Sequence, residues 1–223
     1  MNYPVKVARY HLVRPATYLL LPFLLAFAFA MGAVTARHSH EATGYLLTIF
    51  IYFGVLGMQT TGRSLAFGLA LGASRRSFYS GTTLLGMALA LVSGLVLTAL
   101  QAVERATGGW GMSMHFFRVP YLLNGPWYAT WLTSAVGLFA LFVYGMWHGI
   151  VSRRWAMLGT LAFLAVQVLA VVAGGMAVSF EHWRVHPAAG PGGLTALDLT
   201  GLVAVLAVLL LAGGHATIRR ATV

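Results

Sequence analysis

Histidine and acidic side chains occur at two places in this chain where their spacing could suit metal ligation. His38, His40 and Glu41 form one group, and His182 and His186, four residues apart, form the other. A metal site needs several clustered His, Cys, Asp or Glu ligands. Neither group has the H-E-x-x-H spacing of a helical metalloprotease site. The pattern favours histidines at the surface or at the level of lipid headgroups, and we expect no metal site.

Other catalytic chemistry finds little support in the residues. Ser93 precedes a glycine but lacks the G-x-S-G context of a membrane serine protease, and only His215 stands where a base would be needed. His148 and His215 both lie near the ends of apolar stretches, which leaves a haem between helices open but weakly supported. The chain has no G-x-x-x-x-G-K-[ST] phosphate loop. Any work driven by ATP would therefore need an ATPase in another chain.

The composition places the chain in a membrane. Of its 223 residues, 59% are hydrophobic and 8% are charged, and the mean hydropathy is +0.82. A soluble domain carries roughly 25% charged residues. There is no cysteine, which excludes disulfide and thiolate chemistry. The central parts of the apolar stretches also lack Asp, Glu, Lys and Arg, which argues against an ion-coupled pump, because pumps keep ionisable relays within the membrane.

The charged residues sort into two groups when the chain is folded up and down through its apolar stretches. One side holds ten basic residues and no acidic one: Lys6, Arg9, Arg14, Arg63, Arg75, Arg76, Arg153, Arg154, Arg219 and Arg220. The other side holds four of each sign: Arg37, Arg105, Arg118, Arg184, Glu41, Glu104, Glu181 and Asp198. Basic loops stay in the cytoplasm, so the first side is expected to be cytoplasmic, with both termini on it. The net charge of +10 is then a topology signal, and no nucleic-acid partner is expected.

The expected fold class is all-α: a polytopic membrane protein with six transmembrane helices, in one domain that covers residues 1–223. A spanning helix needs about 20 mainly apolar residues. The predicted spans are residues 16–36, 43–62, 81–102, 129–151, 155–178 and 197–216. The start of the chain also resembles a signal peptide with a cleavage site at residues 34–36, but its apolar run is longer than a usual one. We therefore expect this segment to stay as the first span.

Three features of the segments around the spans carry expectations. The opening residues form a basic amphipathic pattern that suits a short helix in the inner interface, in contact with membrane lipids; its residues are Lys6, Arg9, Tyr10 and Arg14. The outer link between the third and fourth spans is aromatic and suits an aromatic belt; it holds Trp110, Phe116, Phe117, Tyr121 and Trp127. The inner link between the fourth and fifth spans is short, at residues 152–154.

Glycine is frequent within the spans. Gly145 and Gly149 form a G-x-x-x-G pair in the fourth predicted span. Small residues let membrane helices approach closely. Packing within one subunit is the favoured interpretation, ahead of a dimer seam.

The inner link from Gly62 to Gly81 is too apolar for a free loop. Phe67, Leu71 and Arg75 follow an i, i+4, i+8 stripe, which predicts a short amphipathic helix that packs on a partner or on the membrane surface. Ser74 stands where it could cap a helical turn. Two adjacent arginines follow it, and they could pair with acidic groups of a soluble partner or merely anchor the topology.

At these residues the chain resembles the small permease subunits of bacterial ATP-binding-cassette exporters of the type-2 permease family, with the closest likeness to short actinobacterial members. The pattern of that family is approximately L-x-x-G-x-[ST]-R-[RK]-x-[FY]-[FY]-x-G, and it covers Leu69 to Gly81 here. The rest of the chain is similar only in its six spans, its cytoplasmic ends and its basic first helix. The resemblance implies a coupling helix that rests on a separate ATPase, with contact residues Leu69, Leu71, Gly72, Ser74, Arg75, Arg76, Phe78 and Tyr79.

The resemblance implies more about assembly. Such permeases pair as homodimers or related heterodimers, bind two ATPase subunits and release substrate along a path between the two copies. ATP and Mg²⁺ are then expected in the partner ATPase, with no cofactor in this chain. One departure is that the larger outer link here lies between the third and fourth spans, and not between the fifth and sixth, which leaves the outer gate undefined.

The expected function is therefore the transmembrane subunit of an ABC exporter in the plasma (inner) membrane, without enzymatic activity of its own. The alternative is a membrane scaffold or accessory subunit that does not transport. The substrate and the residues that bind it are not readable from the sequence, although the uncharged spans suit an amphipathic or apolar cargo.

Overall fold

The computed structural model describes residues 20–24, 26–28, 44–62, 64–70, 72, 74–110, 117, 126–182 and 196–220. The elements in these residues are helices, and no β-strand occurs among them, so the all-α prediction is confirmed for the part of the chain that is described. The named helices are α3 (Gly44–Gly62), α4 (Ser64–Ala70), α5 (Arg75–Ala106), α6 (Trp127–His182) and α7 (Ala196–Arg220). Residues 21–24 and 26–28 are helical as well.

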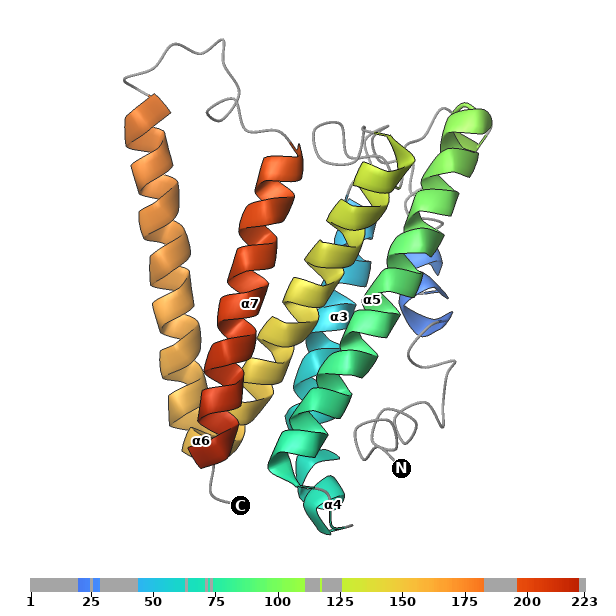
Figure 1. Ribbon diagram of the computed structural model, residues 1–223. Helices are drawn as coiled ribbons and strands as arrows, with labels where there is room; N and C mark the ends of the chain where they lie inside the picture. The colour runs from blue at the N-terminus through green and yellow to red at the C-terminus, as the bar shows by residue number, and fades with distance from the viewer. Residues whose placement is uncertain are drawn as a thin grey trace.

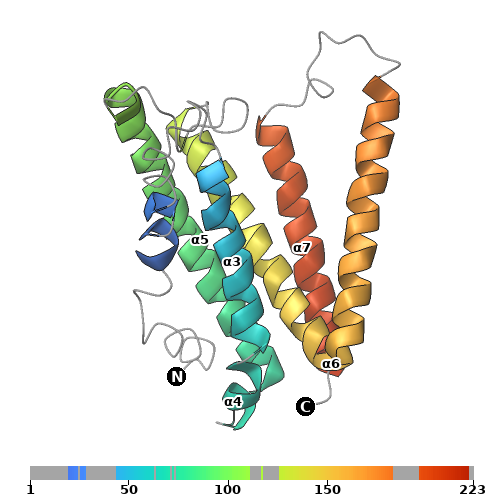
Figure 2. The same ribbon diagram turned by 180° about the vertical axis from the view of Figure 1, so that it is seen from behind.

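The helices run up and down between two ends of a bundle (Figures 1 and 2). One end, named the α4 end here, holds α4, the start of α5 and the end of α7. The opposite end, named the far end, holds the end of α5, both termini of α6 and the start of α7. Arg75 and Arg76 open α5 at the α4 end, and α7 closes there with two further arginines. Among the described elements, this order agrees with the sorting of charges in the sequence.

Helix α6 differs from the prediction for its middle. The sequence suggested a loop at residues 152–154, but the backbone remains helical from Trp127 to His182. The figures show that the chain nevertheless reverses its direction within α6, at the α4 end (Figures 1 and 2). Two arms result: the first arm, Trp127–Ser152, and the second arm, residues 153–182. The predicted reversal between the fourth and fifth spans is therefore present, but it is a sharp bend within α6 and not a separate loop.

Three helices among the described residues are long and apolar enough to cross a membrane: Arg75–Ala106, Trp127–Ser152 and Leu197–Thr217. They correspond to the third, fourth and sixth predicted spans. The second predicted span, 43–62, coincides with α3, whose apolar part, Leu46–Gly62, is shorter. The fifth, 155–178, lies in the second arm of α6, and the first, 16–36, lies mostly outside the described residues.

The closest helix packing joins α3 to the first arm of α6. A Cβ atom added at Gly57 would overlap the backbone carbonyl of Phe142, and one added at Gly145 would overlap the carbonyl of Gly54. A Cβ at Gly149 would meet the Thr61 hydroxyl. Glycine at these positions lets the two backbones touch, as small residues do in membrane helices. The Gly145–Gly149 pair thus packs within the subunit, as predicted.

Helix α5 buries one face along its whole length. The buried side chains follow a helical repeat: Phe78, Tyr79, Thr82, Leu85, Leu89, Ala90, Ser93, Leu97, Gln101 and Glu104. This face meets the first arm of α6, where the ring of Phe142 fills the space that Gly86 leaves open and Ala135 abuts Gly94. The indole of Trp131 adds a hydrogen bond to the carbonyl of Leu91, at 3.1 Å.

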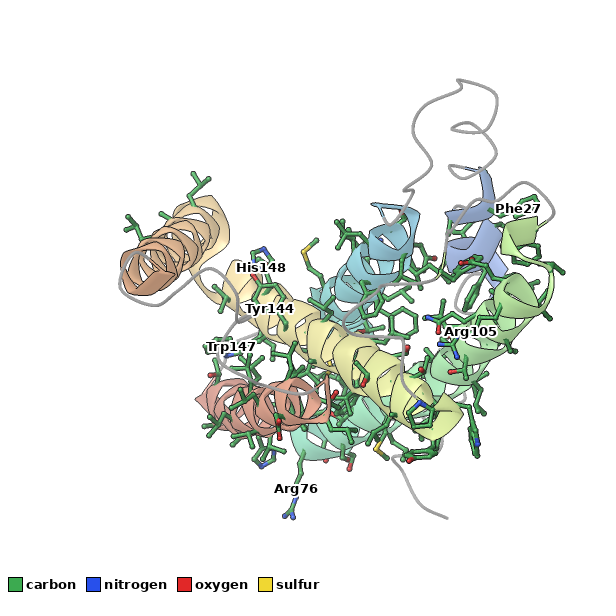
Figure 3. The ribbon with its side chains drawn as sticks, turned by 90° about the horizontal axis from the view of Figure 1, so that it is seen from above. Phe27, Arg76, Arg105, Tyr144, Trp147 and His148 are labelled. Atoms are coloured by element: carbon green, nitrogen blue, oxygen red, sulfur yellow. The ribbon has the colours of Figure 1, made fainter. Side chains whose placement is uncertain are left out.

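Helix α7 presents most of its apolar surface outward. Its exposed residues include Leu197, Leu199, Leu202, Val205, Leu206, Val208 and Leu209. At the far end, the second arm of α6 stands apart from the first arm and from α7 (Figure 3), and Leu161 and Leu169 on it are exposed. Exposed apolar helices of this kind are suited to contact with lipid or with another membrane helix.

Candidate functional site

The segment that carries the sequence motif forms an elbow at the α4 end, defined here as α4, the turn after it and the first turn of α5. Gly72 has a φ of +82°, a left-handed conformation that glycine adopts readily, and its amide donates a hydrogen bond to the Leu69 carbonyl at 2.9 Å. Ser74 then caps α5: its hydroxyl oxygen accepts a hydrogen bond from the Ser77 amide at 3.1 Å. The predicted capping role of Ser74 is confirmed.

The stripe that the sequence placed on a single helix is divided between two elements. Phe67 belongs to α4, which ends at Ala70, whereas Arg75 opens α5. The left-handed turn at Gly72 breaks the i, i+4, i+8 geometry, because it changes the direction of the backbone between them. The elbow is therefore two helices joined by a tight turn. A short helix between the second and third predicted spans is present as α4, but the prediction that its stripe extends to Arg75 was wrong.

The two arginines occupy an unusual place on a helix. The first turn of α5 contains no acidic residue, and Arg75 and Arg76 stand at its N-terminal end. The helix macrodipole makes that end partly positive, so a cation there is unfavourable by about 0.3–1 kcal/mol at an exposed site. Arg75 is half-buried, and Arg76 is exposed and projects away from the bundle (Figure 3). Helix stability does not account for these charges, whereas an acidic partner or a topological role would.

The two aromatic residues of the motif face inward. Phe78 is 1% exposed, and its ring lies where a Cβ atom at Gly68 would stand, so it packs against α4. Tyr79 is buried as well, and its hydroxyl donates a hydrogen bond to the backbone carbonyl of Leu211 in α7, at 2.9 Å. Both side chains therefore brace the elbow from within.

The other predicted contact residues are placed only in part. Leu69 is half-buried, while Gly72 and Ser74 are exposed. Leu71 and the predicted interfacial helix with Lys6, Arg9, Tyr10 and Arg14 lie outside the described residues. Among the predicted contact residues that are described, Gly72, Ser74 and Arg76 are thus the exposed ones, and Phe78 and Tyr79 support the elbow from within.

A second polar cluster, at the far end, was not predicted. Glu104 is 2% exposed, and its Oε2 accepts hydrogen bonds from the Trp110 indole at 3.2 Å and from the Phe117 amide at 2.9 Å. Gln101, one turn earlier, donates from Nε2 to the Phe117 carbonyl at 2.6 Å. The Trp110 and Phe117 rings meet edge to face, with centroids 6.3 Å apart. These four residues are named the Glu104 cluster.

The Glu104 cluster changes the interpretation of the aromatic outer link. Trp110 and Phe117 pack against the end of α5, whereas Trp127 is 66% exposed, as the interpretation as an aromatic belt requires. A carboxylate that accepts N–H donors gains charge-assisted hydrogen bonds, which compensate for its burial. The available sequence signal was an acidic residue at the end of a span with a tryptophan six residues later.

His148 and His215 have separate aromatic neighbours. His148 lies beside Tyr144 on the first arm of α6 (Figure 3), with ring centroids 6.5 Å apart, and His215 lies beside Tyr79, with centroids 5.7 Å apart. Among the residues that the structure describes, no three of His, Cys, Asp and Glu come together to hold a metal ion. His38, His40, Glu41 and His186 lie outside them. The elbow remains the site that the geometry distinguishes best.

Comparison of the chain with protein-family models, with curated proteins and with solved structures finds no match.

Proposed function

We propose that this chain is the six-span membrane subunit of an ATP-binding-cassette exporter, and that a separate ATPase docks on the elbow. Three long apolar helices and the alternating order of α5, α6 and α7 support a polytopic membrane protein. The basic α4 end is the cytoplasmic end in this proposal, because positively charged segments remain in the cytoplasm. Both termini are then cytoplasmic, and the membrane is the plasma (inner) membrane.

The observation that carries the proposal is the position of Arg76 on a braced elbow. The side chain is exposed and points away from the bundle, while Phe78 and Tyr79, just behind it, are buried against α4 and α7. A contact that transmits force needs such a support, because a mobile loop would absorb the displacement. The positive charge at a helix N-terminus is stabilised when acidic groups of a partner approach it.

The ATPase supplies the chemistry in this proposal. ATP and Mg²⁺ bind to the partner, since the chain has no phosphate-binding loop of its own. Closure of the ATPase displaces α4, and α5 transfers the displacement across the membrane. The substrate path forms between two copies of the chain or between this chain and a related one. The exposed apolar faces of α7 and the second arm of α6 are compatible with such pairing and with lipid.

The test is affinity purification of the tagged chain from its native membranes in mild detergent, followed by identification of its partners. The expected result is an ATPase with Walker motifs in near-equal amount. A variant with Arg75→Glu and Arg76→Glu serves as the matched negative control. A stable monomer that recovers no ATP-binding protein would contradict the proposal and favour the non-transporting scaffold.

A further inference from the structure

The first turn of α5 contacts two other helices through consecutive aromatic side chains. Phe78 packs on Gly68 of α4, and Tyr79 donates its hydroxyl hydrogen bond to the Leu211 carbonyl of α7 at 2.9 Å. Consecutive residues on a helix point about 100° apart. One short segment of α5 can therefore hold α4 on one side and α7 on the other.

Helix α7 is shaped to receive Tyr79. A Cβ atom at Gly214 would lie 2.5 Å from the Tyr79 hydroxyl oxygen and 3.3 Å from its ring carbon Cζ. A Cβ at the neighbouring Gly213 would meet nothing within 4 Å. The tyrosine therefore packs against Gly214, where it needs the missing side chain, and it does not contact Gly213. We name the contact among Tyr79, Leu211 and Gly214 the Tyr79 clasp.

A second hydrogen bond holds α7 nearer the far end. The hydroxyls of Thr133 and Thr200 lie 2.8 Å apart and join the first arm of α6 to α7. Thr200 is buried and lies within the first turns of α7, whereas Leu211 lies three turns further along. Helix α7 is thus held to α6 close to the far end and to α5 close to the α4 end.

We propose that Tyr79 is a positioning residue that makes the α4-end half of α7 move together with α4. This inference rests on the proposed function, because the displacement of α4 is the one that an ATPase would produce. With Thr200 held to α6 and Leu211 held to α5, a displacement of the elbow tilts α7 about its Thr200 contact. The angle between α7 and the first arm of α6 then changes, although the ATPase docks on the elbow and not on α7.

A double-mutant cycle tests the clasp without any ATPase. Tyr79→Phe removes the hydrogen bond, and Gly214→Ala places a methyl group against the hydroxyl. In the double variant the hydroxyl is gone, so the added methyl group meets only the ring. We expect each single variant to lower the melting temperature by about 2–4 °C, and the double variant to be no less stable than Tyr79→Phe alone. Gly213→Ala and Tyr128→Phe are the matched controls. Gly213→Ala should leave the melting temperature unchanged or raise it slightly, and Tyr128→Phe should leave it unchanged.

A distance measurement tests the motion. Because the chain has no cysteine, spin labels can be placed at Ala70→Cys on α4 and Ala216→Cys on α7, both at exposed positions, with a reference at Thr107→Cys. The measurement uses the complex with the ATPase recovered from native membranes. Trapping with ATP and vanadate should change the 70–107 and 216–107 distances and leave the 70–216 distance unchanged. In Tyr79→Phe, the 70–216 distance should change on trapping.

The possible results test the role of Tyr79 separately from the proposed function. Additive destabilisation in the cycle would overturn the clasp whatever the partner is. A 70–216 distance that responds to ATP and vanadate equally in the unsubstituted background and in Tyr79→Phe would overturn the positioning role. Failure to recover any ATPase from native membranes would refute the proposed function instead, and with it the source of the motion, while the result of the cycle would stand.

Discussion

Thr61 donates its hydroxyl hydrogen bond to the backbone carbonyl of Met146, at 2.9 Å, and so ties α3 directly to the main chain of α6. The same oxygen also lies 3.1 Å from the Gly57 carbonyl on its own helix. A hydrogen bond from a short side chain to the backbone of another helix requires the two helix axes to be very close. The glycines of both helices provide that closeness, and they therefore determine how α3 and the first arm of α6 pack.

Replacing Gly145 should disrupt this packing. A methyl group at Gly145→Ala would overlap the Gly54 carbonyl, and overpacking of this kind costs about 1–3 kcal/mol. We expect a lower melting temperature of the purified protein in detergent. Gly201→Ala, where an added Cβ meets nothing within 4 Å, is the matched control and should be neutral or slightly stabilising. Equal stability of the two variants would show that the helices do not approach this closely.

Removal of the cap at Ser74 should loosen the elbow. Ser74→Ala deletes the oxygen that accepts the Ser77 amide, with an expected loss of about 1 kcal/mol. Hydrogen exchange at the Ser77 amide should become faster, whereas Ser74→Asp should preserve protection because aspartate is also a good cap. Unchanged exchange in Ser74→Ala would contradict the described start of α5.

Glu104 should control the order of the residues that it binds. In Glu104→Ala the Phe117 amide loses its acceptor, and its hydrogen exchange should accelerate by roughly 10-fold or more, since bonds to charged groups contribute about 1.5–3 kcal/mol. Glu104→Gln should give an intermediate rate, because an amide oxygen still accepts. Thr98→Val, on the same helix and half-buried, is the control and should leave that amide protected. If the Phe117 amide remained protected from exchange in Glu104→Ala, the described hydrogen bond to Glu104 would be contradicted.

Charge at the elbow should matter for assembly. The double variant Arg75→Glu, Arg76→Glu should reduce recovery of the ATPase severalfold, because acidic groups that approach the helix N-terminus would then be repelled. Arg75→Lys with Arg76→Lys keeps the charge and should retain most of the binding. Arg105→Glu, at the opposite end of α5, controls for a general effect of charge on the protein. If all three variants recovered the same amount of ATPase, the charge of Arg75 and Arg76 would serve only to set the membrane topology.

Local patterns in the sequence predicted local structure well. The helical segments, the cap at Ser74 and the packing of Gly145 within the subunit each follow from residues close together in the chain, and the structure confirms them for the described residues. The sorting of charges also gave the relative direction of α5, α6 and α7 correctly. These features depend on hydropathy, on glycine and on side-chain oxygen, which are properties of single residues or of short windows.

Features that depend on distant residues were missed or misplaced. The bond from Tyr79 to Leu211 joins residues 132 positions apart, and no local pattern indicates it. The Glu104 cluster requires the chain to turn back on α5, which the sequence did not specify. The stripe through Phe67, Leu71 and Arg75 does not continue as one helix, because Gly72 adopts a left-handed turn that the periodicity of the neighbouring residues does not indicate.

Crosslinking from position 76 tests the central claim most directly. A photoreactive amino acid introduced there in cells should form an adduct with an ATP-binding protein, while the same group at position 198, exposed at the far end, should not. The account predicts an adduct from position 76 that disappears when the ATPase is deleted. A position 76 that reacts only with reagents supplied outside the cell, or that crosslinks to no ATP-binding protein, would contradict it.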